Sequence, residues 1–259
     1  MTHLHSDVAG SGPPLVLLHG WALHAGLFAP LIPELARRFR VYAVDLPGHG
    51  YSPPVAPNSF DAIVQALDDA FASVGEPLSV LGWSFGGMLA LRWAHAKPER
   101  LTKLILVATT PRFVASTDWP HAIAPQALAR FADELTLAYR LTLQRFLTLQ
   151  TRGTAEGNAL LKELRARLLE LGVPSKAALQ DALALLSTID LRRDAAQIRT
   201  PALVVAGDHD ALTPAAAGRW LARTLPNARY ANIAGAAHAP FLSHPTAFYD
   251  VANSFFDDV

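Results

Sequence analysis

The stretch "SVLGWSFGGMLAL", residues 79–91, places a serine between an apolar run and a segment of helical character. Gly82, Ser84 and Gly86 form a Gly-x-Ser-x-Gly pattern within it. A serine in this pattern, after a strand and before a helix, is typical of a nucleophile elbow, a sharp turn that exposes the hydroxyl above a sheet. The alternative is a glycine-rich turn with a solvated serine, because the bare pattern is common. The strand and helix on either side favour Ser84 as a nucleophile.

Apolar runs of strand length recur along the chain, bounded by Gly, Pro or Asp. They lie at residues 14–20, 41–48, 78–83, 101–108, 202–207 and 228–233. Continuous apolar runs are typical of parallel strands that are covered on both faces. Helical patterns separate them, at residues 27–38, 59–74, 86–96, 214–224 and 245–256. The alternation predicts an α/β fold with a mostly parallel sheet flanked by helices.

One long interval interrupts the alternation. Between the strand that ends near Ala108 and the strand that starts near Ala202, the sequence has four segments with helical spacing of Leu and Phe, and no convincing strand. Gly153 and the segment 172–174 separate these helical patterns. We therefore expect an α/β core of residues 1–112 and 190–259, with a helical cap inserted at residues 113–189.

The composition limits function and location. Of the 259 residues, 51% are hydrophobic and 17% are charged, which is typical of a globular protein. Basic and acidic side chains balance at 22 each, so no overall charge draws the chain to nucleic acid or to a membrane surface. The absence of cysteine excludes disulfides and thiolate metal sites. No signal sequence or membrane-spanning run is evident, so we expect a cytoplasmic protein.

A serine nucleophile needs a base that is oriented by an acid. In this architecture the chain order is Ser, then Asp or Glu, then His. His238, in "AAHAPF" after the last apolar run, is the preferred base, whereas His244 precedes a proline and more naturally opens the final helix. Asp208 and Asp210 are both candidates for the acid, and Asp210 is preferred because it lies further beyond the strand. Asp208 is then a turn-stabilising residue.

The oxyanion of a tetrahedral intermediate needs two backbone donors. The N–H of Phe85, directly after the serine, is one candidate, and the N–H of Trp21 in "LLHGWAL" is the other. The Trp21 side chain could also form a pocket wall. The motif "DLPGHGYS" at residues 45–52 suits a tight turn, for which we expect no catalytic role. No histidine spacing indicates a metal site, and this chemistry needs no metal or organic cofactor.

With these motifs in hand, the chain resembles the α/β-hydrolase superfamily along its whole length. Within it, "TTPRFVASTDWP" and "RFLTLQTRGT" in the cap are similar to segments of the pimeloyl-[acyl-carrier protein] methyl ester esterases of biotin synthesis. The resemblance implies an α/β-hydrolase fold with the triad Ser84, Asp210 and His238, which decides between the two aspartates. It also implies hydrolysis of the methyl ester of a pimeloyl chain on acyl-carrier protein, with release of methanol.

The same resemblance implies which residues contact the substrate and the carrier. Substrate contacts map onto Trp21, the Ser84–Phe85 elbow, His238 and the cap residues Phe146, Leu147, Thr148, Leu149 and Gln150. Basic cap residues would bind the acidic carrier, and Arg145 and Arg152 lie in the segment that matches well. The alternative for these cap charges is a solvated helix face with pairs such as Glu163 with Arg167.

Other functions remain open on the sequence alone. A general short-chain carboxylesterase or a carbon–carbon bond hydrolase would use the same triad, and a ligand receptor could be built on the same fold. Phe113, Trp119 and Phe131 are further candidates for apolar cap walls, with ordinary core packing as the alternative. We expect a monomer that binds neither nucleic acid nor membrane.

Overall fold

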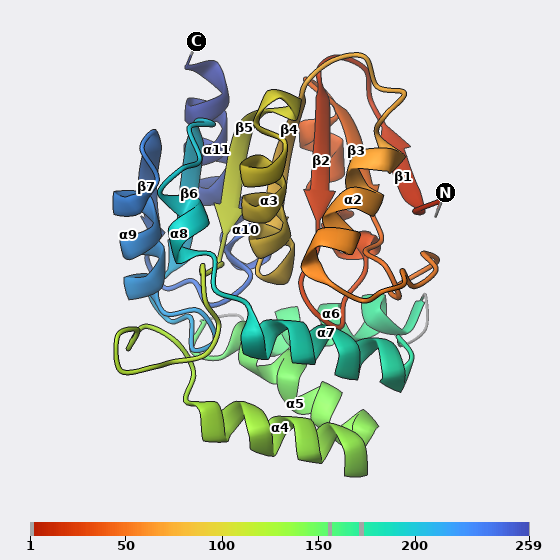
Figure 1. Ribbon diagram of the computed structural model, residues 1–259, viewed down its shortest axis with the longest axis vertical. Coiled ribbons are helices and arrows are strands. Elements are labelled where there is room, and N and C mark those ends of the chain that lie inside the picture. Colours follow the sequence, from red (N-terminus) through yellow and green to blue (C-terminus); the bar gives the residue numbers. More distant parts are fainter. Residues whose placement is uncertain (1–2, 155–156, 171–173, 259) are drawn as a thin grey trace.

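The computed structural model describes residues 3–154, 157–170 and 174–258, without the side chains of residues 163 and 167–170. Within these ranges a seven-stranded sheet runs in the order β1-β3-β2-β4-β5-β6-β7 (Figure 1). Its strands are β1 (Ser6–Ala9), β2 (Pro14–Leu18), β3 (Arg40–Val44), β4 (Leu78–Trp83), β5 (Leu101–Val107), β6 (Ala202–Gly207) and β7 (Ala228–Ile233). Within this described sheet only β1 pairs antiparallel, with β3, and the other neighbouring strands are parallel.

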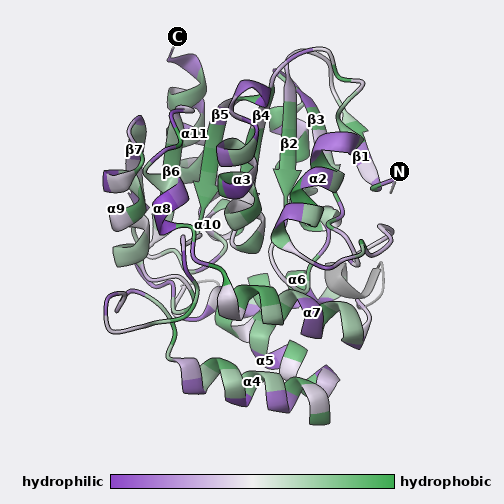
Figure 2. Ribbon diagram, in the orientation of Figure 1, coloured by the Kyte–Doolittle hydropathy of each residue, from purple (hydrophilic) through white to green (hydrophobic). Residues whose placement is uncertain are grey.

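The parallel strands are covered on both faces, as their apolar runs predict. Every residue of β2, β4 and β6 is buried, and Figure 2 shows the central strands in the hydrophobic colour. Alternate residues enter two separate core clusters: Val80 and Leu104 lie in one, and Leu81 and Ile105 in the other. This alternation follows from the two-residue period of a strand. The predicted α/β fold is confirmed.

Helices of the core form a layer on each face of the sheet. On one face lie α2 (Phe60–Ala70), α3 (Phe85–Ala96) and α9 (Ala215–Thr224). On the other lie η1 (Ala25–Phe28), α1 (Ile32–Leu35), α10 (Pro240–Ser243) and α11 (Pro245–Asp257). The short segments η2 (Pro98–Arg100) and α8 (Arg192–Ala195) precede β5 and β6. Ser59 begins α2 as a side-chain cap, because its hydroxyl accepts from the N–H of Ala62.

Two local features differ from the sequence-based expectation. The single helix predicted over 27–38 is wrong, because η1 and α1 are separate short elements. Pro30 and Pro33 lie between and at the start of these elements, and a proline inside a helix removes a backbone donor and clashes with the preceding turn. The strand β1 was not anticipated, since four half-exposed residues carry little apolar signal.

The long interval between β5 and β6 forms four helices, α4 (Pro125–Leu137), α5 (Tyr139–Thr151), α6 (Gly157–Glu170) and α7 (Lys176–Thr188). They gather beyond the carboxyl ends of the parallel strands (Figure 1). The cap boundaries at 113 and 189 stay a prediction, although α4–α7 lie between them. No helix in the described ranges is both long enough and apolar enough to cross a membrane.

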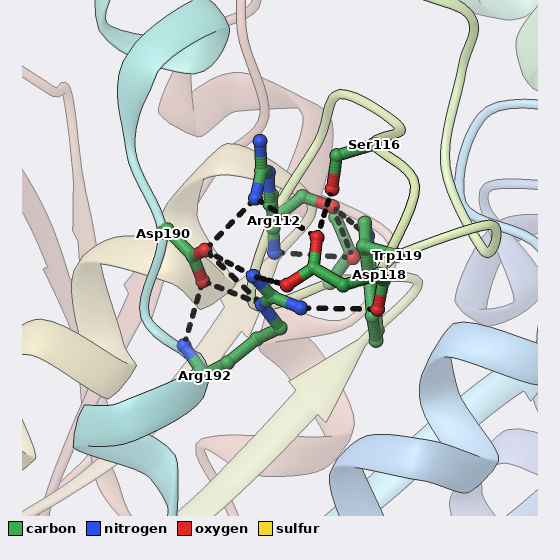
Figure 3. A network of polar contacts seen from close by, with 7 residues as sticks. Arg112, Ser116, Asp118, Trp119, Asp190 and Arg192 are labelled. Atoms are coloured by element: carbon green, nitrogen blue, oxygen red, sulfur yellow. Dashed lines mark hydrogen bonds and ion pairs between the residues drawn. The ribbon is translucent and has the colours of Figure 1, made fainter.

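A network of charged residues joins the two ends of the inserted segment (Figure 3). Arg112, on the entry side, contacts Asp190 on the return side at 3.1 Å. Arg192 contacts Asp190 at 2.7 Å and Asp118 at 2.9 Å. The N–H of Leu191 also donates to the carbonyl oxygen of Pro111 at 2.8 Å. The network therefore holds the base of the cap against the core.

Acid should weaken this network. Hydrogen bonds from Ser116 and Arg192 lower the pKa of Asp118 from 3.8 to about 2. A carboxyl whose folded pKa is depressed stabilises the fold above its unfolded pKa, and this stabilisation is lost as pH falls toward the folded pKa. We therefore expect Asp118→Asn to lower the melting temperature at pH 5–7, with the difference from the native chain shrinking below pH 4 and vanishing near pH 2.

The measurement is a series of thermal melts followed by circular dichroism from pH 7 to pH 2. Glu76→Gln, at an exposed carboxyl before β4, is the matched control and should show no such convergence. A difference between Asp118→Asn and the native chain that persists unchanged at pH 2 would contradict the assigned charge contact.

Candidate active site

Ser84 stands at the junction of β4 and α3 in a backbone conformation that non-glycine residues rarely adopt. Its φ is 55° and its ψ is −116°. Such conformations cost on the order of 1–3 kcal/mol and persist where the surroundings hold them. Here the Ser84 N–H donates to Val107 at 2.9 Å, and the Thr109 hydroxyl donates to the Ser84 carbonyl oxygen at 2.7 Å. Contacts from β5 and the residues after it thus hold the turn.

The two glycines of the motif permit a close approach that any side chain would prevent. A Cβ on Gly82 would lie 2.6 Å from the carbonyl oxygen of Gly86. A Cβ on Gly86 would lie 2.2 Å from the carbonyl oxygen of Leu18. Both contacts are with backbone, which cannot move aside without shifting β2 or α3. The Gly-x-Ser-x-Gly spacing is therefore a packing requirement of this turn.

The structure brings Ser84, His238 and Asp210 together from three different loops. His238 Nε2 lies 2.8 Å from Ser84 Oγ, and His238 Nδ1 lies 2.8 Å from Asp210 Oδ2. His238 is 1% exposed and Asp210 is 6% exposed. An ionised carboxylate only accepts, so Nδ1 carries the imidazole proton and Nε2 is free to accept the serine proton. The arrangement can activate the hydroxyl for attack on a carbonyl.

Asp210 is held by donors on its own loop. Its Oδ1 accepts from the N–H groups of Leu212 at 2.8 Å and Thr213 at 2.9 Å. Its Oδ2 accepts from the Thr213 hydroxyl at 2.7 Å as well as from His238. These bonds fix the orientation of the carboxylate. Thr213 was missed by the sequence reasoning, and its place three residues after the acid in "DALTP" was the only signal.

The alternative acid and base lie outside this hydrogen-bonded series. Asp208 Oδ1 accepts from the N–H of Gly235 at 2.7 Å and so ties together the loops after β6 and β7. His244 Nδ1 lies 2.8 Å from the Ser243 hydroxyl, and the residue is the cap of α11. Asp208 therefore stabilises loop structure, as predicted, but its partner Gly235 is distant in sequence and does not belong to the turn of Asp208 itself.

Trp21 and Phe85, the residues predicted to supply the two oxyanion donors, both lie near Ser84. Phe85 is the first residue of α3, and the first N–H groups of a helix have no partner within it. The loop after β2 brings Gly20 against the serine, because a Cβ on Gly20 would lie 3.3 Å from Ser84 Cβ. Trp21 follows Gly20, and its ring N–H donates to the carbonyl oxygen of Leu179 in α7 at 3.0 Å. We call the loop after β2, residues 19–25, the oxyanion loop, and this hydrogen bond attaches it to α7 of the cap.

An apolar cavity of about 200 Å³ opens above Ser84. Its walls are Trp21, Ser84, Phe113, Ile123, Ala127, Leu128, Phe131, Phe146, Leu149, Leu183, Leu186, Ala211 and Leu212. Among these described residues only Ser84 and Trp21 carry a side-chain polar atom, and none is charged. Trp21 packs edge-on against Phe146 at 4.9 Å and Phe131 at 5.5 Å between ring centroids. The cavity therefore suits an uncharged, aliphatic ligand.

The five cap residues predicted to contact substrate do not lie on one face of α5. Phe146 and Leu149 line the cavity. Leu147 is buried, and it belongs to the hydrophobic cluster that also contains Leu81 and Ile105, away from the cavity. Thr148 is exposed and donates to the carbonyl oxygen of Gln144. A continuous run of five residues covers more than one turn of helix, so Leu147 and Thr148 are displaced from the cavity wall.

Gln150, the fifth residue of that run, lies beside His238. Its backbone oxygen accepts from the N–H of His238 at 3.2 Å. Its side chain is 1% exposed, and Oε1 is buried without a hydrogen-bond partner. One loop away, the carbonyl oxygen of Gly153 lies 2.8 Å from His209 Nδ1. The carboxyl end of α5 and the residues after it therefore contact both the loop of His238 and the loop of Asp210.

The other residues predicted to form cavity walls or to contact the carrier lie in different environments. Phe113 and Phe131 line the cavity, whereas Trp119 packs against Trp220 at 5.0 Å between ring centroids. Arg145 is exposed and contacts Glu134 at 3.1 Å. Arg152 is exposed at the end of α5. The proposed pair of Glu163 with Arg167 falls on side chains outside the described residues.

Comparison of the sequence with known proteins identifies the family of this chain. A family model described as the alpha/beta hydrolase fold matches residues 13–245. A pimeloyl-[acyl-carrier protein] methyl ester esterase of Nitrosomonas europaea is 42% identical, covering 96% of this chain and 97% of the relative. The esterase of the same name from Xanthomonas oryzae pv. oryzae is 45% identical, covering 93% and 94%. The chain belongs to the pimeloyl-[acyl-carrier protein] methyl ester esterase family. The resemblance seen in the sequence is confirmed.

The family match includes the inserted helices, because alignments over more than nine-tenths of the chain cannot omit them. Solved structures agree on the fold. An esterase from Exiguobacterium antarcticum superposes with a TM-score of 0.90 at 21% identity, covering 98% of this chain and 95% of that one. A bromoperoxidase from Bacillus anthracis gives 0.91 at 22% identity with the same coverage. At these identities the likeness concerns the fold alone.

The hydrogen bonds of the two aspartates predict different consequences for the esterase. Asp210→Asn should lower kcat for a p-nitrophenyl ester by about 10⁴-fold, because an amide favours the wrong imidazole tautomer. Asp208→Asn is the matched control, since its carboxyl contacts only loop backbone among the described residues, and should stay within a few-fold of the native chain. Steady-state kinetics of both variants are the measurement. Equal losses in the two variants would contradict the role of Asp210.

Proposed function

We propose that the protein is a serine carboxylesterase that hydrolyses the methyl ester of pimeloyl-[acyl-carrier protein] to the free acid and methanol, a step of biotin synthesis. The observation that supports it most directly is the series Ser84–His238–Asp210 at the floor of an uncharged cavity. The choice of ester rests on relatives of that name that match at 42–45% identity along nearly the whole chain.

Acylation begins when His238 Nε2 takes the Ser84 proton and Ser84 Oγ attacks the ester carbonyl carbon. The negative oxygen of the tetrahedral intermediate is stabilised by the N–H groups of Trp21 and Phe85. Asp210 keeps its charge and stabilises the imidazolium. When the intermediate collapses, the bond to the methoxy oxygen breaks and His238 returns the proton, so that methanol leaves.

Deacylation uses the same groups in the same roles. A water molecule gives a proton to His238 Nε2 and attacks the acyl carbon. The new oxyanion is again held by the Trp21 and Phe85 N–H groups. The bond between the acyl carbon and Ser84 Oγ then breaks, and His238 protonates the serine. The product acid ionises, and no metal or organic cofactor is required by this scheme.

The cavity favours the ester over its own product. A methyl ester is neutral, whereas the product is a carboxylate that loses hydration when it is buried without a cationic partner. Among the described residues that line the cavity there is no Lys, Arg or His side chain. The methylene chain of a pimeloyl group finds apolar walls from Phe113, Phe131 and Leu183. The lining thus supports binding of the ester and release of the acid.

The carrier would approach the cap. Acyl-carrier proteins are acidic, and the exposed Arg145 and Arg152 lie at the outer side and the end of α5, whose Phe146 and Leu149 line the cavity. We infer that these two arginines contact the carrier. The same proposal includes a cytoplasmic monomer that binds neither nucleic acid nor membrane, and the balanced charge supports the absence of nucleic-acid and membrane binding.

The substrate assignment is tested by comparing single-turnover rates on pimeloyl-carrier methyl ester and on free methyl pimelate. We expect the carrier-linked ester to react faster, and the gene to restore growth without biotin in cells that lack the native esterase. Ser84→Ala should lose on the order of 10⁶-fold in kcat on both esters. Near-normal turnover by Ser84→Ala would refute the mechanism, and a preference for the free ester would favour a general short-chain carboxylesterase.

The carrier surface has its own test. Exposed ion pairs contribute about 0.2–1 kcal/mol each, and 1.4 kcal/mol corresponds to a tenfold change. The double variant Arg145→Glu, Arg152→Glu should therefore lower kcat/KM for the carrier-linked ester about tenfold, with a weaker effect at high salt. Its kcat/KM for a p-nitrophenyl ester is the internal control and should not change. An equal loss on both esters would contradict a carrier contact.

A further inference from the structure

His49 belongs to the motif "DLPGHGYS", to which the sequence assigns a turn and no catalytic role. In the structure the ring is 2% exposed and contacts a different loop. Its Nδ1 lies 3.0 Å from the carbonyl oxygen of Pro47, and its Nε2 accepts from the N–H of Ala22 at 3.3 Å. A carbonyl oxygen only accepts, so the proton is on Nδ1 and the lone pair is on Nε2.

The contact reaches the oxyanion loop at its strained residue. Ala22 has a φ of 65°, in the left-handed region that disfavours residues with a Cβ. It directly follows Trp21, and the direction of one peptide group depends on the dihedral angles of its neighbours. Further along, the N–H of Ala25 donates to Asp45 Oδ1 at 2.8 Å. The loop after β3 thus holds the oxyanion loop at two amide groups.

We propose that His49 is a positioning residue of the esterase, whose neutral imidazole holds the Ala22 amide and thereby directs the Trp21 N–H toward the oxyanion. The inference rests on the function proposed above, because it takes Trp21 as an oxyanion donor. His49 itself does not touch the reacting atoms. Its effect is on the geometry of the donor, and hence on transition-state stabilisation more than on substrate binding.

The surroundings of His49 keep its ring neutral. Burial lowers the pKa of His49 below its ordinary value, and outweighs the opposing effects of the Pro47 hydrogen bond and the Asp45 charge. The neighbouring titratable groups are His19, whose ring centroid is 5.4 Å away, His24 on the oxyanion loop, Asp45, and Asp181 across a small cavity. A protonated ring would point an N–H at the N–H of Ala22, and the contact would be lost.

Two substitutions separate the hydrogen bond from the packing. His49→Leu fills a similar volume without an acceptor, and His49→Gln supplies an amide oxygen that can accept from Ala22. On a p-nitrophenyl ester we expect His49→Leu to lower kcat about 10²-fold with little change in KM, since a misplacement of about 1 Å can have that effect. His49→Gln should recover most of kcat. A kcat within two-fold of native for His49→Leu, or no recovery in His49→Gln, would overturn the proposal.

A transition-state analogue gives a second readout. A trifluoromethyl ketone forms an adduct on Ser84 whose negative oxygen occupies the oxyanion position, whereas the corresponding alcohol does not. His49→Leu should weaken binding of the ketone by about the factor by which it lowers kcat, and should leave the affinity for the alcohol unchanged. Equal weakening of both ligands would overturn the proposal, because it indicates a damaged cavity.

Failure of this inference can be told from failure of the proposed function. Activity that survives Ser84→Ala refutes the esterase mechanism itself, whereas loss in Ser84→Ala with native kcat in His49→Leu refutes only the role of His49. If His49→Leu does not fold, nitrogen NMR of the native protein at pH 7 is the test. We expect the His49 proton on Nδ1 and a bare, hydrogen-bonded Nε2. A proton on Nε2 would overturn the proposal.

Discussion

The strained backbone of Ser84, with its positive φ, is the constraint on which the rest of the site depends. At this turn, where φ is 55°, the backbone segments approach so closely that a Cβ on Gly82 or on Gly86 would clash with backbone atoms. The same turn places Oγ beyond the end of the sheet and frees the Phe85 N–H at the start of α3. The Ser84 hydroxyl and the Phe85 N–H, the proposed nucleophile and oxyanion donor, are therefore positioned by one backbone geometry, whose strain is offset by the contacts from Val107 and Thr109.

Parallel strand order brings the other groups to this turn. β2, β4, β5 and β6 all end at the same edge of the sheet, so the loops that carry Trp21, Ser84 and Asp210 converge there although they are far apart in sequence. The carboxyl end of α5 then contacts His238 and His209 through the backbone oxygens of Gln150 and Gly153. The cap thus contributes walls of the cavity and also contacts the loops that hold His238 and Asp210.

The sequence predicted the parts of the molecule whose structure is determined by a short local pattern, namely the turn at Ser84 and the buried strands. The Gly82-x-Ser84-x-Gly86 pattern between a strand and a helix predicts the turn at Ser84, and the continuous apolar runs predict buried parallel strands, so the fold and this turn follow from short stretches. The cavity wall does not, because Phe146 and Leu149 lie on the face of α5 toward the cavity and Leu147 and Thr148 do not, and the short sequence pattern does not fix the rotation of α5 about its axis. The long-range partners Gly235 of Asp208 and Ala22 of His49 had no signal in the sequence, since each bond joins two loops.

The cavity and the frame behind it differ in their polar groups: the described cavity walls carry no charge, whereas the carboxyl group of Asp45 is buried behind the loop after β2. Among described residues the cavity above Ser84 has uncharged walls, which favour a neutral ester and oppose retention of its carboxylate product. Asp45 is fully buried behind the oxyanion loop, where it accepts from the N–H groups of Ala25 and Tyr51. A charge in that position cannot leave its donors without a large loss of solvation, so it fixes the loops after β2 and β3 relative to one another. The proposed esterase therefore combines an uncharged cavity with a catalytic frame held by buried polar contacts.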